Sequence, residues 1–297
     1  MNLTAYLERR RRLVERALDG YVPAVGASPT LVRAMRHSLL GGGKRLRPIL
    51  TIAAAEAVGG DARSVLPFAC ALEMVHTYSL IHDDLPSMDD DDLRRGQPTC
   101  HVVFGEAVAI LAGDALLTEA FRIMAAAALG RAPNKARALQ AINEIAAAAG
   151  ARGMVSGQVA DLEAERREPD LATVEFIHVR KTGALLLASV RAGALLSGAG
   201  TRVLRALSVY GEALGLAFQV ADDILDAEAP TSVTGKHRGR DQARHKMTFP
   251  AVMGLGAAKQ RARELLDQAI GAVQGFDRRA QPLREIAGYV VARAATG

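Results

Sequence analysis

The stretch that begins at Ser79, "SLIHDDLPSMDDDDLRRGQPT", concentrates aspartates directly after a hydrophobic run and directly before Arg94 and Arg95. Neighbouring like charges destabilise a helix, and a buried carboxylate is costly unless a cation meets it. The pattern therefore has two interpretations. Either the aspartates form a solvated acidic loop, or a multivalent cation binds to them.

A second aspartate cluster ends another hydrophobic stretch, "VLRALSVYGEALGLAFQVADDILDA", whose apolar residues recur every three or four positions, as in a helix with one buried side. Gln219, Asp222 and Asp226 share one face of that helix because residues three and four apart are neighbours. Oxygen ligands without His or Cys suit Mg²⁺, which commonly bridges carboxylates to phosphates. Two such clusters, each after a helical run, favour a cation site over two solvated loops.

The first cluster needs a bend in the chain if its members Asp83, Asp84 and Asp89 are to act together. Asp83 and Asp89 are six residues apart, so a regular helix would not place them side by side. Pro86 cannot continue the helical hydrogen bonds. We therefore predict a turn at residues 85–88 that returns Asp89 to the side of Asp83.

Cationic residues accompany both clusters. In "GGGKRLRP", Lys44 and Arg47 stand at the opening of a helix after three glycines, where close backbone approach and the helix N-terminus favour an anion. The segment is not a P-loop, and a flexible loop between two helices explains it as well. Other groups near the clusters are His76, Arg94, Arg95, Lys181 with Thr182, Lys236 and Lys246. Each alone is an ordinary surface cation or core residue, but together they indicate sites for an anionic small molecule.

The elements that must hold these residues are predicted to be helices. Clusters of Gly and Pro such as "VGGDARS" and "RRGQPT" recur at spacings typical of helix ends, and strand-like alternation is missing between them. Alanine and leucine are abundant and Trp is absent, which favours helices over sheets. We predict an all-α protein, a single bundle of ten or more helices that forms one domain over residues 1–297.

Composition argues against several other classes of protein. The net charge is +5, but the cations are scattered and no nucleic-acid-binding motif is present. Cys70 and Cys100 are too few for a disulfide framework or zinc site and fit a reducing cytosol. The N-terminus lacks the apolar core of a signal peptide, and Asp114 and Glu119 interrupt the run "AVAILAGDALLTEAF". We expect a soluble, cytoplasmic protein without a membrane span.

The chain closely resembles a known family. The blocks that carry the resemblance, in the family order and over nearly the whole chain, are "GGGKRLRP", "HTYSLIHDDLPSMDDDDLRRGQPT", "FGEAVAILAGDALL", "GQVADL", "RKTGALL", "FQVADDILD" and "GKHRGRDQARHKMTFPA". They resemble the trans-polyprenyl diphosphate synthases, in particular the bacterial short-chain farnesyl diphosphate synthases. The resemblance implies helices around a central cavity, a homodimer, and Mg²⁺-dependent condensation of isopentenyl diphosphate with dimethylallyl and geranyl diphosphate.

The same resemblance implies roles for individual residues. Two Mg²⁺ ions would bind Asp83, Asp84 and Asp89, and a third would bind Asp222 with Asp226 near. The allylic diphosphate would be held by Arg94, Lys181, Lys236 and Lys246, and isopentenyl diphosphate by Gly43, Lys44, Arg47, His76 and Arg95. Thr182 and Gln219 would face the developing carbocation, so the implied catalytic residues are Lys181, Thr182, Gln219 and Arg94.

Product length is implied to depend on the helix before the first cluster. Tyr78 precedes Asp83 by five residues and lies about 7–8 Å deeper along the helix. An aromatic residue there resembles the floor that stops the family's product at farnesyl length, although a helical wheel places Ser79 closer to the direction of Asp83. Two alternatives stay open: a geranylgeranyl diphosphate synthase with a deeper pocket, and a non-catalytic partner subunit of a prenyl synthase.

Overall fold

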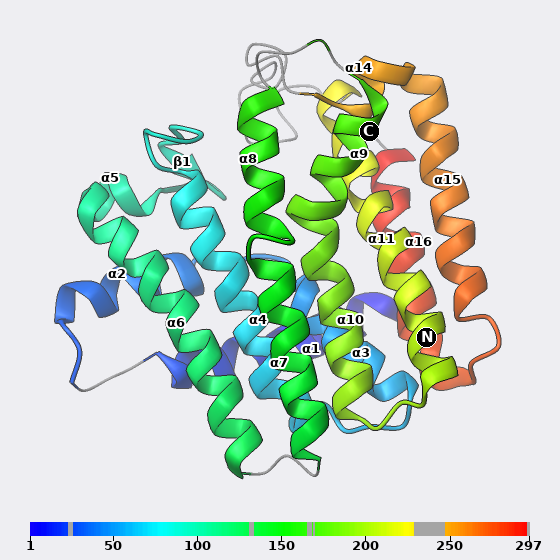
Figure 1. Cartoon of the computed structure of the whole chain (residues 1–297), viewed down its shortest axis with the longest axis horizontal. Coiled ribbons are helices and arrows are strands. Elements are labelled where there is room, and N and C mark those ends of the chain that lie inside the picture. The colour runs from blue at the N-terminus through cyan, green and yellow to red at the C-terminus, as the bar shows by residue number, and fades with distance from the viewer. Residues whose placement is uncertain (23–25, 131–133, 165–167, 169, 229–246, 296–297) are drawn as a thin grey trace.

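The structure is a computed structural model that describes residues 1–22, 26–130, 134–164, 168, 170–228 and 247–295. These residues form more than ten helices and one two-stranded sheet, which confirms the all-α prediction (Figure 1). That residues 1–297 form one domain around a central cavity stays a prediction. The elements run in the order α1 (Leu3–Tyr21), α2 (Pro29–Leu40), α3 (Leu46–Ala57), α4 (Ala62–Asp83), β1 (Leu93–Arg94), β2 (Gln97–Pro98), α5 (Cys100–Phe104), α6 (Glu106–Gly130), α7 (Lys135–Ala149), α8 (Met154–Ala164), α9 (Leu171–His178), η1 (Val179–Gly183), α10 (Ala184–Leu196), α11 (Thr201–Glu228), α14 (Phe249–Met253), α15 (Leu255–Ala272), η2 (Arg278–Ala280) and α16 (Gln281–Ala295).

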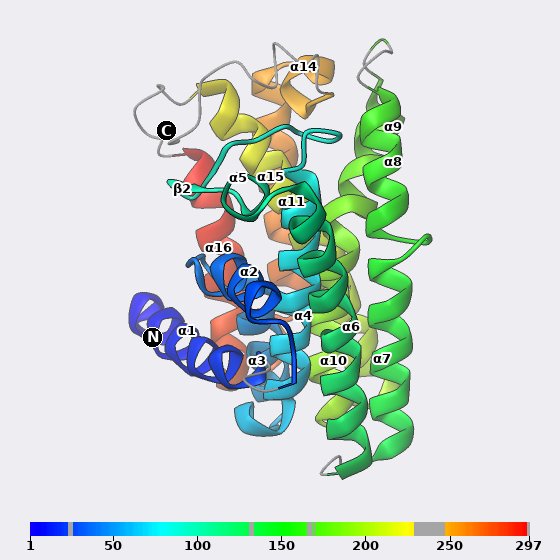
Figure 2. The ribbon, with the colours of Figure 1, turned by 90° about the vertical axis from the view of Figure 1, so that its left-hand side faces the viewer.

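The helices share an apolar interior that α3 and α10 join. Helix α4 packs most extensively against α6, α11 against α15, and α10 against α3. One cluster of buried side chains gathers around α4, α6 and α7, and a second gathers around α11, α15 and α16. Helices α3 and α10 contribute residues to both clusters. The two views agree in placing α6 and α7 side by side, on the side of the molecule away from α16 (Figures 1 and 2).

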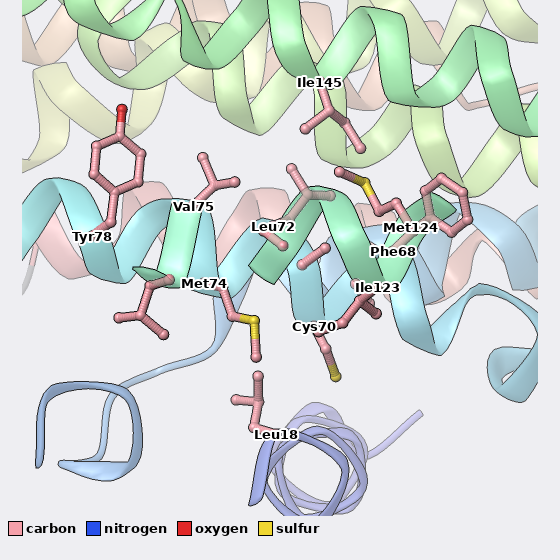
Figure 3. Close-up of a cluster of buried hydrophobic side chains, with 14 of the residues drawn as sticks. Leu18, Phe68, Cys70, Leu72, Met74, Val75, Tyr78, Ile123, Met124 and Ile145 are labelled. Carbon is pink, nitrogen blue, oxygen red and sulfur yellow. The ribbon is translucent and has the colours of Figure 1, made fainter. Parts of the chain in front are cut away.

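Helix α4 is buried on more than one side, which explains why its sequence is apolar almost throughout. Figure 3 shows Tyr78, Val75 and Leu72 pointing to one side of α4, while Met74 points to the other side, toward Leu18 of α1. Asp61 caps the start of the helix, and its carboxylate accepts hydrogen bonds from the backbone N–H groups of the first turn. It ends at Asp83, the first residue of the acidic cluster.

The sequence analysis missed one short β-hairpin. Strands β1 and β2 pair antiparallel, with Leu93 opposite Pro98 and Arg94 opposite Gln97. The two residues between them, Arg95 and Gly96, have φ angles of 55° and 76°. A two-residue turn with positive φ at both positions matches the twist of the strands it joins. The hairpin therefore gives Arg94 and Arg95 a fixed place beside the acidic cluster.

The expectation that the chain lacks a membrane span stays a prediction, because two helices meet the length and composition that a span requires. Helices α4 and α11 are both long and apolar enough, but 67% and 50% of their most apolar windows are buried inside the protein. The core helix of a soluble protein passes the same test. Their C-terminal ends, which carry the two aspartate clusters, lie at the same end of the bundle (Figure 1).

Candidate active site

The first aspartate cluster is gathered by a tight turn at the end of α4. The backbone N–H of Asp89 donates to the carbonyl oxygen of Asp83 at 2.8 Å, and that of Asp91 donates to Asp84 at 3.1 Å. Asp90 adopts a φ of 49°, in the left-handed region that Asn and Asp tolerate better than most residues. The predicted turn after Asp83 is present, so Asp83 and Asp89 are adjacent despite their separation in sequence.

The carboxylates of this turn repel one another and are partly compensated by two cations. The pKa of Asp83 is raised to about 6. Burial is the largest cause, and the charges of Asp89 and Asp84 add to it, whereas Lys181 and Arg94 oppose the shift. Asp84 is buried and accepts a hydrogen bond from Nε of Arg94 at 2.7 Å. The turn thus concentrates negative charge that a cation would stabilise.

Lys181 lies on a π-helical turn between α9 and α10 and reaches this cluster. Its Nζ lies 2.7 Å from the Asp161 carboxylate on α8. Burial opposes the charged amine, but Asp161 and Asp83 together raise the pKa of Lys181. Short π-helical turns inside α-helices are frequent at functional sites. Thr182, the next residue, lies on the same turn and is partly buried.

A glycine allows α8 to approach this turn. A Cβ atom built on Gly157 would overlap the backbone of Lys181. Only glycine therefore fits the contact between α8 and η1, and this contact places Asp161 beside Lys181. Sequence reasoning noted the block "GQVADL" as part of a resemblance but gave Gly157 and Asp161 no role.

The second aspartate cluster lies at the end of α11. Gln219 and Asp222 are partly buried and Asp226 is exposed. Burial lowers the pKa of Arg47, at the start of α3, and the negative charge of Asp222 offsets part of that lowering. Asp223 is also partly buried, and its Oδ2 accepts hydrogen bonds from His178 Nε2 and from the backbone N–H of Phe249, both at 2.9 Å.

A third group of side chains is cationic and gathers around His76. Burial lowers the pKa of His76 well below its ordinary value, and Arg47, Arg95 and Arg94 lower it further. Arg47 is partly buried, its Nε atom finds no hydrogen-bond partner among the described residues, and its pKa is lowered to about 10. Positive charges beside a neutral histidine form a site for an anion.

A buried ion pair lies beside this cationic group and holds the segment that carries Lys44 and Arg47. Arg45 Nη1 lies 2.8 Å from the carboxylate of Glu73 on α4, and Arg45 Nη2 donates to the carbonyl of Leu39 at 2.8 Å. The Arg45 side chain is 0% exposed, and that of Glu73 is 2% exposed. Arg45 is fixed between α2 and α4, so its neighbour Lys44, which is exposed, and Arg47 are held in place at the start of α3.

The glycine loop before α3 contacts the hairpin. Gly43 has a φ of 129°, and a Cβ atom there would lie 2.6 Å from the guanidinium of Arg95. The Arg95 side chain donates to the carbonyl of Gly42. The positive φ favours glycine at this position whatever the space, and the loop lies against the Arg95 side chain.

The two candidate chain-length residues differ in their surroundings. Tyr78 is buried, and its ring meets that of His82 edge to face at 5.7 Å between centroids. Ser79 is partly buried, and its hydroxyl donates to the carbonyl of His76 in the same helix at 2.9 Å. Two other predicted site residues, Lys236 and Lys246, lie outside the described residues.

The donor atoms of both clusters fit Mg²⁺ by their chemistry. All are carboxylate oxygens, the ligands that Mg²⁺ prefers, and the pKa of Asp83 is raised by burial and further by the charges of Asp89 and Asp84. Within the described ranges no group of three or more His, Cys, Asp or Glu side chains is arranged to hold a metal by itself. Mg²⁺ usually binds through one or two carboxylates, with water and phosphate oxygens completing the shell. The arrangement therefore suits Mg²⁺ that arrives with a phosphate ligand.

Several residues of this site were missed because their partners are distant in sequence. Arg45 and Glu73 are 28 residues apart, Asp161 and Lys181 are 20 apart, and His178 and Asp223 are 45 apart. No local pattern signals such pairs. One signal that could have found such a pair is Glu73, a single acidic residue inside the apolar run of α4, where a buried charge would need a partner.

Comparison with known proteins gives consistent results. The chain matches the profile of the polyprenyl synthetase family over residues 28–286. A farnesyl diphosphate synthase of Geobacillus stearothermophilus is 49% identical over 261 residues, 88% of this chain and 88% of that protein. The chloroplastic heterodimeric geranylgeranyl pyrophosphate synthase large subunit 1 of Arabidopsis thaliana is 45% identical over 294 residues, 97% of this chain and 79% of that protein. The apo structure of an FPP/GFPP synthase from Zymomonas mobilis has a TM-score of 0.87 at 39% identity and covers 98% of this chain and 99% of its own.

Proposed function

The chain belongs to the polyprenyl synthetase family, and from this premise we propose that it is a farnesyl diphosphate synthase of isoprenoid biosynthesis. The enzyme condenses isopentenyl diphosphate head to tail with dimethylallyl diphosphate and then with geranyl diphosphate, and each step releases pyrophosphate. One observation carries the proposal. The site has an acidic turn with Lys181 and Arg94 beside it, and a separate cationic group of Arg47, Arg95 and His76. Two diphosphates require two such sites.

The allylic diphosphate is assigned to the acidic turn. Asp83, Asp84 and Asp89 would hold two Mg²⁺ ions there, and Asp222 with Asp226 would hold a third, in a family of the Mg²⁺-dependent prenyl synthase type. Bound Mg²⁺ offsets the negative charge of the leaving diphosphate. Arg94 and Lys181 bind the diphosphate oxygens directly, together with Lys236 and Lys246.

The isopentenyl diphosphate is assigned to the cationic group. Arg47, Arg95 and Lys44 neutralise its charge, and Gly43 leaves room at the loop. His76, kept neutral by its surroundings, contributes a hydrogen bond rather than a charge. The buried Nε of Arg47 offers a donor that the described protein leaves unused.

The reacting carbons lie between these two sites in this proposal. Thr182 and Gln219 present oxygens toward the carbocation that forms when the allylic carbon–oxygen bond breaks. Electrostatic stabilisation fixed in advance is the largest contribution that such a site makes to catalysis. Arg94 and Lys181 act in the same step because negative charge grows on the diphosphate as it leaves.

The finer features of the proposal rest on family resemblance and surface chemistry. We propose a cytoplasmic homodimer that binds no nucleic acid and does not insert into membranes. Support for the dimer comes from apolar side chains exposed on α5 and α6: Val102, Val103, Ile110 and Leu111. Such a surface favours contact with a second protein chain.

A product assay tests the function. Purified protein, Mg²⁺ and isopentenyl diphosphate are combined with dimethylallyl or geranyl diphosphate, and the chain lengths of the products are resolved. We expect farnesyl diphosphate, abolished by a chelator and by Asp83→Ala. Geranylgeranyl diphosphate as the main product would retain the chemistry and favour the alternative of a deeper pocket. Absence of any condensation would favour a non-catalytic partner subunit.

A further inference from the structure

Asp223 differs from its neighbours in the second aspartate cluster. Among the described residues, its Oδ2 atom accepts two hydrogen bonds, from His178 Nε2–H and from the backbone N–H of Phe249, at 2.9 Å each. A carboxylate oxygen has about two lone-pair sites, so these donors occupy Oδ2. Successive residues of an α-helix point about 100° apart, so Asp223 cannot face the same way as Asp222.

The two donors come from two different helices, which pack against α11 and against each other. His178 ends α9, and Phe249 begins α14. Their rings stack, with centroids 5.4 Å apart and an interplanar angle of 27°, and His178 and Phe249 are 6% and 0% exposed. A single carboxylate oxygen therefore joins α9, α11 and α14 beside two buried rings.

His178 is the residue immediately before the π-helical turn η1. That turn carries Lys181 and Thr182, while α11 carries Gln219 and Asp222. A π-helical turn has weaker intrinsic support than an α-helical one and is maintained by its surroundings. A second contact fixes the same two elements, because a Cβ atom on Gly215 of α11 would lie 2.9 Å from Cα of Gly183. The position of α11 against η1 is thus fixed at two places: where Asp223 binds His178, just before η1, and where Gly215 lies against Gly183.

We propose that Asp223 is a positioning residue and not a metal ligand: through His178 and Phe249 it sets the position of Asp222 and Gln219 relative to Lys181 and Thr182. The inference rests on the proposed function only for the roles of the groups that are positioned. These two hydrogen bonds are the contacts by which Asp223 joins the three helices, so their loss displaces the elements they join.

Substitution separates the two roles. Asp223→Asn keeps a side-chain oxygen that accepts both N–H groups, whereas Asp223→Ala removes it. We expect Asp223→Asn to retain the wild-type Mg²⁺ concentration for half-maximal activity within about twofold, and Asp223→Ala to lose about tenfold or more in kcat. Melting temperatures in EDTA provide a readout without metal. Asp223→Ala and His178→Ala should both lower the melting temperature, and the double variant should be little worse than either single one.

Asp222→Asn is the matched comparison. It should raise the half-maximal Mg²⁺ concentration by about tenfold or more without lowering the melting temperature in EDTA. If Asp222→Asn leaves the Mg²⁺ dependence unchanged, the proposed metal site is wrong, and the EDTA measurements on Asp223 still decide its structural role. An Asp223→Asn variant that needs about tenfold more Mg²⁺, with an unchanged melting temperature in EDTA, would overturn the inference. That comparison holds even if Asp223→Ala does not fold.

Discussion

Asp89 donates its backbone N–H to the carbonyl oxygen of Asp83 at 2.8 Å, so two aspartates six residues apart stand side by side at the end of α4. Burial of the Asp83 carboxyl, with a smaller contribution from the negative charge of Asp89, raises the pKa of Asp83 to about 6. Unfavourable charge of this kind is stored in the metal-free site and relieved when a cation binds. The site is therefore less stable without its ligands than a neutral turn would be.

The first prediction concerns pH and Asp83. Its pKa in the folded protein lies above the ordinary value of 3.8, so the folded state binds this proton more tightly than the unfolded state does. The contribution of Asp83 to stability is thus favourable below about pH 4 and is lost as the pH rises toward about 6. In EDTA, Asp83→Asn should melt a few degrees above wild type at pH 7.5 and show no such gain at pH 4.

The control for this experiment is Asp92→Asn, which changes an exposed aspartate of the same segment. It should shift the melting temperature little at either pH. Mg²⁺ with an unreactive diphosphate analogue should raise the melting temperature of wild type at pH 7.5 and have a smaller effect on Asp83→Asn. An Asp83→Asn variant that is less stable than wild type in EDTA at pH 7.5 would contradict the stored repulsion.

The second prediction concerns the buried pair of Arg45 and Glu73. Arg45→Met leaves the Glu73 carboxylate buried without its partner, so the free energy of unfolding should fall by about 3–5 kcal/mol. The double variant Arg45→Met/Glu73→Gln should recover part of that loss. Because Arg45 fixes the loop that carries Lys44 and Arg47, the KM for isopentenyl diphosphate should rise about tenfold in the double variant, a loss of about 1.4 kcal/mol.

Urea unfolding and steady-state kinetics check both parts. The KM for geranyl diphosphate should change little, because the allylic site does not contact Arg45. Arg12→Met, which removes an exposed ion pair with Glu8, is the control and should alter neither stability nor KM appreciably. Equal changes in the KM for both substrates would mean that the pair supports the fold in general and not the isopentenyl site.

The third prediction concerns the approach of α8 to η1. Gly157→Ala places a Cβ atom against the backbone of Lys181 and should displace Asp161 from its amine. We expect kcat/KM for the allylic substrate to fall about tenfold or more, since a shift of α8 against η1 misplaces the Lys181 amine. Gly271→Ala on α15 meets no atom within 4 Å and is the matched control. It should leave activity unchanged and raise stability slightly, because alanine favours helix.

What the sequence allowed to be predicted here was local. The helices, the turn after Asp83 and the shared face of Gln219, Asp222 and Asp226 each depend on spacings of a few residues. The contacts of Asp223 could not be found in this way, because His178 and Phe249 lie on other helices. A run of aspartates also gives no sign of which member accepts hydrogen bonds from neighbouring helices. The left-handed backbone at Arg45, with a φ of 52°, could not be predicted either, because glycine is the residue that usually signals a positive φ.

The last prediction concerns product length. Tyr78, Val75 and Leu72 point to the same side of α4, with Tyr78 the one nearest Asp83 (Figure 3). If the growing chain extends along this side, the Tyr78 ring stops it. Tyr78→Ala should shift the product from farnesyl toward geranylgeranyl diphosphate, and Tyr78→Phe, which keeps the ring, should still yield farnesyl. Because truncating a buried aromatic costs about 3–5 kcal/mol, assays should be run well below the melting temperature.

Ser79→Ala decides between the two chain-length candidates. The Ser79 hydroxyl is already bonded within its own helix and the side chain is small, so its removal frees little space. We expect the product of Ser79→Ala to remain farnesyl diphosphate. Longer products from Ser79→Ala, together with an unchanged spectrum from Tyr78→Ala, would place the pocket along the neighbouring face of α4. Unchanged spectra from both variants would place the chain-length determinant on another helix.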